Sequence, residues 1–296
     1  MSGFYHEPFT PNTLLPFIVQ TCSNLLSLNL RWSRMNASTL NHLIDYPQFI
    51  HLQTLDLTGC QTLNDTLLIN MFIRSETQFQ LKKLILEGCM NISWISLDTI
   101  AICIPDLLQL NISRCIGLKN LSSNSTSTCF HHWPKLQSLD VGHLLTLTDQ
   151  DLAIIFDHCK YLNTLIFDGC FSVTDQIFHH LTSNFRMLSL NGCTNISTHV
   201  LLNLNEQCPQ IEVLHLNSIP NFNDSCLLKW SEQPLMKLRH LTIDNCKQCS
   251  LNSIDKFLSK HVNLRELSLT GDMVTNLIER RILQEKFSHI QFVFQS

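Results

Sequence analysis

The stretch from Leu162 to Asp175, LNTLIFDGCFSVTD, decides the fold. Its first six residues follow the pattern LxxLxL, whose apolar positions alternate with other residues at the end. Such alternation is typical of a short β-strand with one face buried. A glycine and a cysteine come next, and the closing Thr-Asp pair is a signal for the N-terminus of a helix. The stretch therefore predicts a strand, a tight turn and the start of a helix.

The LxxLxL pattern recurs along nearly the whole chain at intervals of 23 to 29 residues. A period of this length is the signature of a leucine-rich repeat solenoid, in which each unit gives one short parallel strand and one return segment. Eleven strand units are present: LLSLNL from Leu25, LQTLDL from Leu52, LKKLIL from Leu81, LLQLNI from Leu107, LQSLDV from Leu136, LNTLIF from Leu162, FRMLSL from Phe185, IEVLHL from Ile211, LRHLTI from Leu238, LRELSL from Leu264 and the degenerate FSHIQF from Phe287.

We therefore expect an α/β leucine-rich repeat solenoid, a right-handed horseshoe with parallel strands on the concave face and helices on the convex face. Residues 1–24 are expected to form a partial N-terminal capping repeat, and residues 25–296 the array, with an irregular Ser/Thr-rich loop at 121–134. The final strand is expected to pack Phe287, Ile290 and Phe292 and to leave Val293 and Phe294 exposed or in contact with a partner.

Most cysteines follow the same period. A column eight positions after the first apolar residue of each unit alternates between cysteine and aliphatic residues, which indicates a small buried hydrophobe. Its members are Cys60, Cys89, Cys115, Leu144, Cys170, Cys193, Ile219 and Cys246. A second apolar column lies three positions later and includes Cys249, so the C-x-x-C formed by Cys246 and Cys249 is predicted to be two core columns rather than half a zinc site or a redox dithiol. A further set lies at the ends of the return segments: Cys22, Cys103, Cys159 and Cys208.

Glycine precedes the cysteine column in several units, at Gly59, Gly88, Gly169, Gly192 and Gly271, with Ser218 and Asn245 as substitutes. We expect a turn with positive φ at this position. The sequence contains no phosphate-binding glycine motif, and it contains no nucleophile elbow, HExxH motif or carboxylate pair. No catalytic residue, cofactor or metal is therefore expected, and the protein is predicted not to be an enzyme.

Composition excludes further classes of function. A net charge of −4 does not indicate nucleic-acid binding, and no apolar run is long enough to span a membrane. The N-terminus lacks the features of a secretory signal, so we expect a cytoplasmic or nuclear protein with free thiols at its thirteen cysteines. His131 and His132 stand beside Cys129 and Trp133 in the loop at 121–134; a metal site there is the alternative to the preferred interpretation, a solvated mobile loop.

The repeat resembles a known family. LxxLxLxxCxx(I/L/V)(T/S/N)D, followed by a helix that ends in Cys-(Pro)-x-Leu, is similar to the cysteine-containing leucine-rich repeats of the F-box/LRR proteins. It is represented best by Leu162 to Asp175 and by Cys208-Pro209-Gln210-Ile211. The resemblance implies a substrate receptor of an SCF-type cullin-RING ubiquitin ligase, with the array holding the target and an F-box holding the ligase adaptor. No F-box is visible upstream of the array, so the chain is either a fragment whose F-box is missing or a stand-alone array, as in the similar mitotic-exit antagonist proteins that lack an F-box.

The candidate binding surface follows from the alternation of side chains along each strand. Leucine positions point to the core, and the residues between them point to the concave side, where acidic residues outnumber Lys and Arg six to two. The alternative is that this face is only solvated. The predicted protein-binding residues are Asp56, Ile85, Glu87, Asp140, Ile166, Asp168, Met187, Val213, His215 and Asp244.

The strand-face residues predict a module that binds a protein partner, with a basic segment in that partner. The resemblance to the F-box/LRR proteins implies that this module serves ubiquitin-dependent protein degradation as part of an SCF-type E3 ligase. A cullin-RING adaptor is expected as a second partner only if an F-box is missing from this chain. The competing hypothesis is a stand-alone scaffold or inhibitor that binds partner proteins without a ligase.

Overall fold

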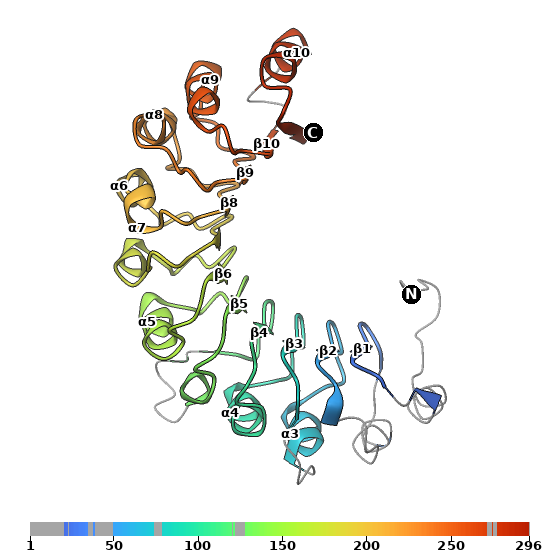
Figure 1. Ribbon diagram of the computed structural model, residues 1–296. Coiled ribbons are helices and arrows are strands. Elements are labelled where there is room, and N and C mark those ends of the chain that lie inside the picture. The colour runs from blue at the N-terminus through green and yellow to red at the C-terminus, as the bar shows by residue number, and fades with distance from the viewer. Residues whose placement is uncertain are drawn as a thin grey trace. The chain divides into compact units, whose positions relative to one another are not determined.

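Short parallel strands and the helices that follow them build the chain in the computed structural model (Figure 1). The structure describes residues 21–22, 24–34, 38, 50–73, 79–119, 121, 128–270, 274 and 277–295. The predicted capping repeat at 1–24 therefore lies almost entirely outside the described residues. The chain divides into two compact units, Met1–Leu162 (unit 1) and Asn163–Ser296 (unit 2). Within the described residues, no helix is long and apolar enough to cross a membrane.

Unit 1 contains five strands, each paired in parallel with the next along the chain. The pairing keeps the leucines in register, because Leu28, Leu55 and Leu84 lie opposite one another. Helices lie on one side of these strands (Figure 1). The elements are β1 (Ser27–Asn29), β2 (Thr54–Asp56), α3 (Asp65–Ile73), β3 (Lys83–Ile85), α4 (Trp94–Cys103), β4 (Gln109–Asn111), the 3-10 helix η2 (Cys129–His132), β5 (Ser138–Asp140) and α5 (Asp149–His158).

Unit 2 continues the same alternation with six strands, again paired in chain order. The elements are β6 (Thr164–Ile166), the 3-10 helix η3 (Asp175–His179), β7 (Met187–Ser189), α6 (Thr198–Leu202), α7 (Leu204–Gln207), β8 (Val213–His215), α8 (Asp224–Glu232), β9 (His240–Thr242), α9 (Leu251–Lys260), β10 (Glu266–Thr270), α10 (Leu277–Lys286) and β11 (Gln291–Gln295). The predicted α/β class and the eleven parallel strands are confirmed.

The core lies between the strands and the helices of each unit. Leucines of the LxxLxL pattern are fully buried from β2 onward, together with the cysteine column. Burial of several such side chains in every repeat supplies the main stabilisation, since each buried Leu contributes roughly 1.5–3 kcal/mol. Each repeat can bury its apolar side only against its neighbours, which explains why the pattern must recur.

Helices begin where the sequence places polar caps. Thr148 caps α5 in a capping box with Asp151, in which each side chain accepts a hydrogen bond from the backbone N–H of the other residue. Asn223 and Ser250 cap α8 and α9 in the simpler way, by accepting from a backbone N–H of the first turn.

The turn after each strand has the predicted backbone conformation. Glycines at this position have φ between 66° and 70°, and the substitutes Ser218 and Asn245 have φ of 57° and 60°. Non-glycine residues in this region are uncommon, so a requirement for positive φ is built into the repeat. Gly271 lies outside the described residues.

The Ser/Thr-rich segment differs from the expected mobile loop where the structure describes it. Residues 129–132 form η2, and Phe130 and Trp133 are among the largest fully buried side chains. Phe130 contacts both Trp94 and Trp133 at ring-centroid distances of 6.3 and 6.0 Å. The aromatic residues at the end of this segment thus supply the core contacts of a return helix, which the polar residues before them conceal in the sequence.

The last strand is also displaced from its predicted position. In the observed register Phe292 pairs with Leu267 and Phe294 with Leu269, so the strand begins at Gln291. Helix α10 runs to Lys286, which leaves Phe287 and Ile290 buried in the connection that follows it. Phe294 is half-buried beneath the guanidinium of Arg280 rather than exposed.

Candidate protein-binding surface

The side chains between the leucines form a separate strand face on each unit. We call them the strand face of unit 1 and the strand face of unit 2. Strand register aligns them in rows, so that in unit 2 Met187 lies opposite Val213 and Val213 lies opposite His240. The second row of unit 2 contains Ile166, Ser189, His215, Thr242, Ser268 and the half-buried Val293.

Four predicted site residues belong to unit 1. Ile85, Glu87 and Asp140 are half-buried, but Asp56 is only 7% exposed. Asp56 accepts hydrogen bonds from the backbone N–H and hydroxyl of Thr58 at 3.0 and 2.6 Å, and Arg31 pairs with its second oxygen at 3.3 Å. Its carboxylate is therefore occupied within the protein.

The other unit 1 carboxylates also have internal partners. Glu87 pairs with Arg114 at 3.7 Å, and Asp140 accepts from the backbone N–H of Gly142 at 3.0 Å. The sequence predicts that Asp140 lies close to Asp168, but these residues belong to different units, and that proximity stays a prediction. Ile85 is the apolar member of this strand face.

The remaining six predicted residues lie on unit 2, and five of them are half-buried: Ile166, Asp168, Met187, Val213 and His215. The register brings Met187 and Val213 side by side, and Ile166 lies opposite Ser189 on the next strand. This half-exposed apolar group sits among polar side chains, which is the composition of the centre of many protein interfaces.

Asp168 is the best-connected carboxylate of unit 2. One oxygen accepts from the Ser189 hydroxyl at 2.6 Å and from the Asn191 backbone N–H at 3.0 Å, and the other accepts from the Asn191 side chain at 3.0 Å. Asn191 in turn accepts from the backbone N–H of Asn217, and Asn217 from that of Asp244, each at 2.7 Å. These side chains join four successive strand ends.

Asp244 is the last member of this chain of hydrogen bonds and is only 6% exposed. Its Oδ2 accepts from the Ser268 hydroxyl at 2.8 Å. Its Oδ1 is buried and has no hydrogen-bond donor among the described residues. Burial raises the pKa of this carboxyl above its ordinary value, and the bond from Ser268 opposes that change in part.

Histidines add a titratable component to the same face. Burial lowers the pKa of His215, whose Nδ1 lies 3.0 Å from the Thr242 hydroxyl. His240 lies 3.5 Å from Glu266 in the first row.

Sequence reasoning missed two features near these faces. Asn191 and Asn217, which hold the strand ends together, are absent from the predicted site, although asparagine at the position after the strand was a visible signal. An exposed apolar row on the loops of unit 1 was also missed: Met90, Ile116 and Leu145 are 46%, 57% and 57% exposed. Each follows the cysteine column by one position.

The cysteine column is confirmed as buried and has an added function. The thiols of Cys115, Cys193 and Cys246 donate to backbone carbonyl oxygens of the preceding repeat at 3.0, 3.2 and 3.2 Å. Burial raises the pKa of Cys246 to about 11 and that of Cys249 further. The two thiols bond to different backbone carbonyls, those of Leu216 and Phe222, which fits two core columns.

At the ends of the return segments, Cys159 and Cys208 are buried, whereas Cys103 is half-buried and Cys22 is exposed. Where side chains are described, three or more His, Cys, Asp or Glu residues do not come together in a way that could hold a metal. His131, proposed above as a possible ligand beside Cys129, lies against His158 with the two rings tilted by 32° and their centroids 3.5 Å apart.

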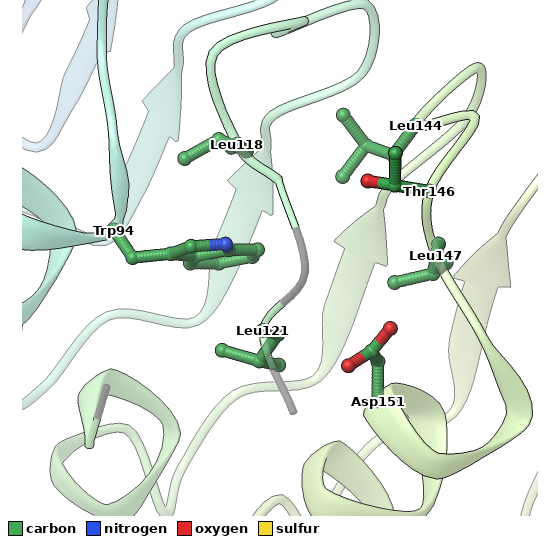
Figure 2. A pocket seen from close by; sticks show the side chains of 7 residues that line it. All are labelled: Trp94, Leu118, Leu121, Leu144, Thr146, Leu147 and Asp151. Atoms are coloured by element: carbon green, nitrogen blue, oxygen red, sulfur yellow. The ribbon is translucent and has the colours of Figure 1, made fainter. Parts of the chain in front are cut away.

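Unit 1 contains a small hollow, which is shown in Figure 2. Trp94, Leu118, Leu121, Leu144 and Leu147 supply most of its lining, and Asp151 lies at one side. It leaves no room for a water molecule. Asp151 is already bound to Thr148 in the capping box, so this hollow is part of the core packing.

Comparisons with known proteins bear on the fold. No protein-family model matches the sequence. The chain is similar to a chain in the crystal structure of the Rad7 and Elc1 complex in yeast, with a TM-score of 0.60 and 16% identity over 84% of this chain and 70% of that chain. It is also similar to the leucine-rich repeat-containing protein LegL7 from Legionella pneumophila, with a TM-score of 0.55 and 17% identity over 90% of this chain and 89% of that chain.

The fold is a leucine-rich repeat solenoid. Sequence identities of 16% and 17% indicate a shared fold but do not indicate a shared function. The function of this chain therefore depends on its own residues.

Proposed function

We propose that the chain is a non-enzymatic module that binds a partner protein on its strand faces. The observation that carries the proposal is the apolar group of Ile166, Met187 and Val213, half-exposed on a strand face whose other side chains from β6 to β10 are polar. Apolar side chains surrounded by a polar rim supply most of the affinity at many interfaces. The Rad7 structure is that of a complex with a second protein, Elc1, which supports a protein-binding function by analogy of fold.

The finer proposal is that the module recognises substrates for an SCF-type E3 ubiquitin ligase in the cytoplasm or nucleus. It rests on the resemblance of the cysteine-containing repeat to the F-box/LRR proteins. The adaptor of the ligase would bind an F-box outside the sequence described here. A stand-alone scaffold or inhibitor is the alternative, and it predicts the same binding surface without the adaptor.

A basic segment of the partner is proposed as the element that the strand faces bind. Acidic side chains would steer such a segment to the surface, and the apolar group would hold it. Because Asp56 and Asp168 are occupied by internal donors, their contribution would come from their field rather than from direct contact.

The test is affinity capture with the protein tagged at its own gene, so that any upstream coding sequence is kept. Three forms are compared: wild type, the strand-face double variant Met187→Ser and Val213→Ser, and the helix-side double variant Leu228→Ser and Ile282→Ser. The control side chains are apolar, exposed and on the same unit. We expect the strand-face variant alone to lose the principal partner without a change in melting temperature.

Two results would contradict parts of the proposal. Loss of the partner in the helix-side variant, with retention in the strand-face variant, would show that the face is wrong. Capture of a partner without a cullin-RING adaptor would reject the ligase function and favour the stand-alone alternative.

A further inference from the structure

Carboxylates on the strand faces differ in how many internal donors they have. Both oxygens of Asp56 and of Asp168 have donors within the protein, and Glu87 is paired with Arg114. Asp244 has a donor on Oδ2 alone. Among the described strand-face residues, its Oδ1 is the buried carboxylate oxygen that has no donor.

This arrangement is unfavourable for the folded protein. A buried acceptor without a donor loses its bonds to water and gains nothing in return. Asp224 in the same unit shows the usual solution: its carboxylate accepts from the backbone N–H of Ser250 and from the hydroxyl of Ser253. These bonds leave the pKa of Asp224 below its ordinary value, whereas burial raises that of Asp244.

The charges around Asp244 do not supply the missing donor. The titratable side chains on the strands β8, β9 and β10 are His215, His240 and Glu266, and Cys246 follows Asp244 by two positions. His215 is bound to Thr242, His240 to Glu266, and the Cys246 thiol donates to Leu216. None of these groups therefore supplies a donor to Oδ1.

We propose that Oδ1 of Asp244 accepts a hydrogen bond from a lysine or arginine side chain of the bound partner, a proposal that rests on the protein-binding function above. A cationic donor fits best because it supplies both the hydrogen bond and the opposite charge that a buried carboxylate lacks. The oxygen lies below the surface of the free protein, so neighbouring polar side chains change rotamer when the cation enters. Asp244 thereby becomes the point at which the strand face of unit 2 selects a basic segment.

The proposal predicts that a change at Asp244 raises stability and lowers affinity. If Asp244 had only a structural role, the change would lower stability and leave affinity unaffected. Asp244→Asn removes the unpaired charge and keeps the shape, so we expect the melting temperature to rise by roughly 2–4 °C. The same change removes the anionic acceptor, so affinity for a basic segment falls about tenfold or more. The matched control Asp224→Asn removes a carboxylate with internal donors, which lowers the melting temperature and leaves affinity unchanged.

The probes are two capped, fluorescent twelve-residue peptides at low salt, one alternating Arg with Leu and the other Glu with Leu, measured by fluorescence anisotropy with the full chain. We expect the Arg peptide to bind wild type more tightly than the Glu peptide and to lose this preference with Asp244→Asn. As the pH is lowered, affinity should fall more for wild type than for Asp244→Asn, because protonation of Asp244 competes with the cation. Protonation of His215 acts on both forms and cancels in the comparison.

Three results would overturn the inference: a lower melting temperature for Asp244→Asn, unchanged affinity of that variant, or no preference of wild type for the Arg peptide. None of them would reject protein binding as such, because that function is tested separately by the Met187 and Val213 double variant with the captured partner.

Discussion

Lowering the pH should destabilise unit 2 through one buried histidine, His261. Its side chain is 3% exposed and stacks on Phe257 at a centroid distance of 3.8 Å. Nδ1 lies 2.8 Å from the Phe257 carbonyl oxygen, which can only accept, so Nδ1 carries the hydrogen. Nε2 accepts from the backbone N–H of Leu235 at 3.1 Å and must be unprotonated to do so.

The magnitude follows from the difference between the folded and unfolded states. Burial lowers the pKa of His261 from 6.5 to about 4. The unfolded chain therefore takes up a proton first as the pH falls, and stability that is fully present above pH 6.5 is lost between pH 6.5 and 4. Each pKa unit corresponds to about 1.4 kcal/mol, which gives a loss of about 2 kcal/mol by pH 5 and about 3 kcal/mol by pH 4.

The assay is urea unfolding from pH 7 to pH 4, followed by fluorescence. Trp230 is the tryptophan of unit 2 and packs on Phe257 at 6.4 Å, so it reports on this region. His261→Gln cannot titrate, and we expect it to be less stable than wild type at pH 7 but to lose less stability as the pH falls. If the free energies of unfolding of the two proteins fall in parallel between pH 6.5 and 4, the reasoning is refuted.

Three further predictions concern the repeat itself. Burial raises the pKa of Cys193 to about 12. Under native conditions a thiol reagent should therefore modify the exposed Cys22 rapidly and Cys193 only after denaturation. Equal rates of modification would contradict the burial of Cys193. A Cβ at Gly117 would collide with the Ile92 carbonyl oxygen, whereas a Cβ at Gly88 would have no such collision and would only be placed on a backbone with an unfavourable φ of 69°. Gly117→Ala should therefore lower the melting temperature more than Gly88→Ala, and the reverse order would refute this. Asp65 accepts from the backbone N–H and hydroxyl of Ser93 at 2.7 and 2.6 Å; Asp65→Ala should cost about 1–3 kcal/mol in chemical unfolding, and a neutral result would show that water replaces these bonds.

The order of the repeats and the burial of their leucines could be predicted from the sequence because both depend on residues a fixed number of positions apart. The C-x-x-C at Cys246 was explained in the same way. Predictions failed where one repeat departs from the regular spacing. In the degenerate FSHIQF, the LxxLxL pattern places Ile290 opposite Leu267, whereas the structure places Phe292 there. The aromatic cluster of Phe130 and Trp133 was hidden because the residues before it are polar.

The candidate site was harder to predict, because exposure of a strand-face carboxylate depends on its neighbours in the next repeat. Alternation alone places Asp168 and Asp244 on the same face and makes them equivalent. Their difference arises from Ser189 and Asn191, which donate to Asp168, and from the single hydroxyl of Ser268 beside Asp244. Spacing within one repeat contains no information about such contacts between repeats.

The side-chain bonds between repeats have a direction. At three junctions an aspartate of one repeat accepts from a serine of the next, as Asp65 does from Ser93, Asp175 from Ser197 and Asp224 from Ser250. In these pairs the acceptor and the donor belong to different kinds of repeat, because Trp94, Thr198 and Leu251 follow the three serines at the position that aspartate occupies in the acceptor repeat. Two adjacent repeats are therefore the smallest segment that can be copied or deleted in tandem with this bond kept intact inside it.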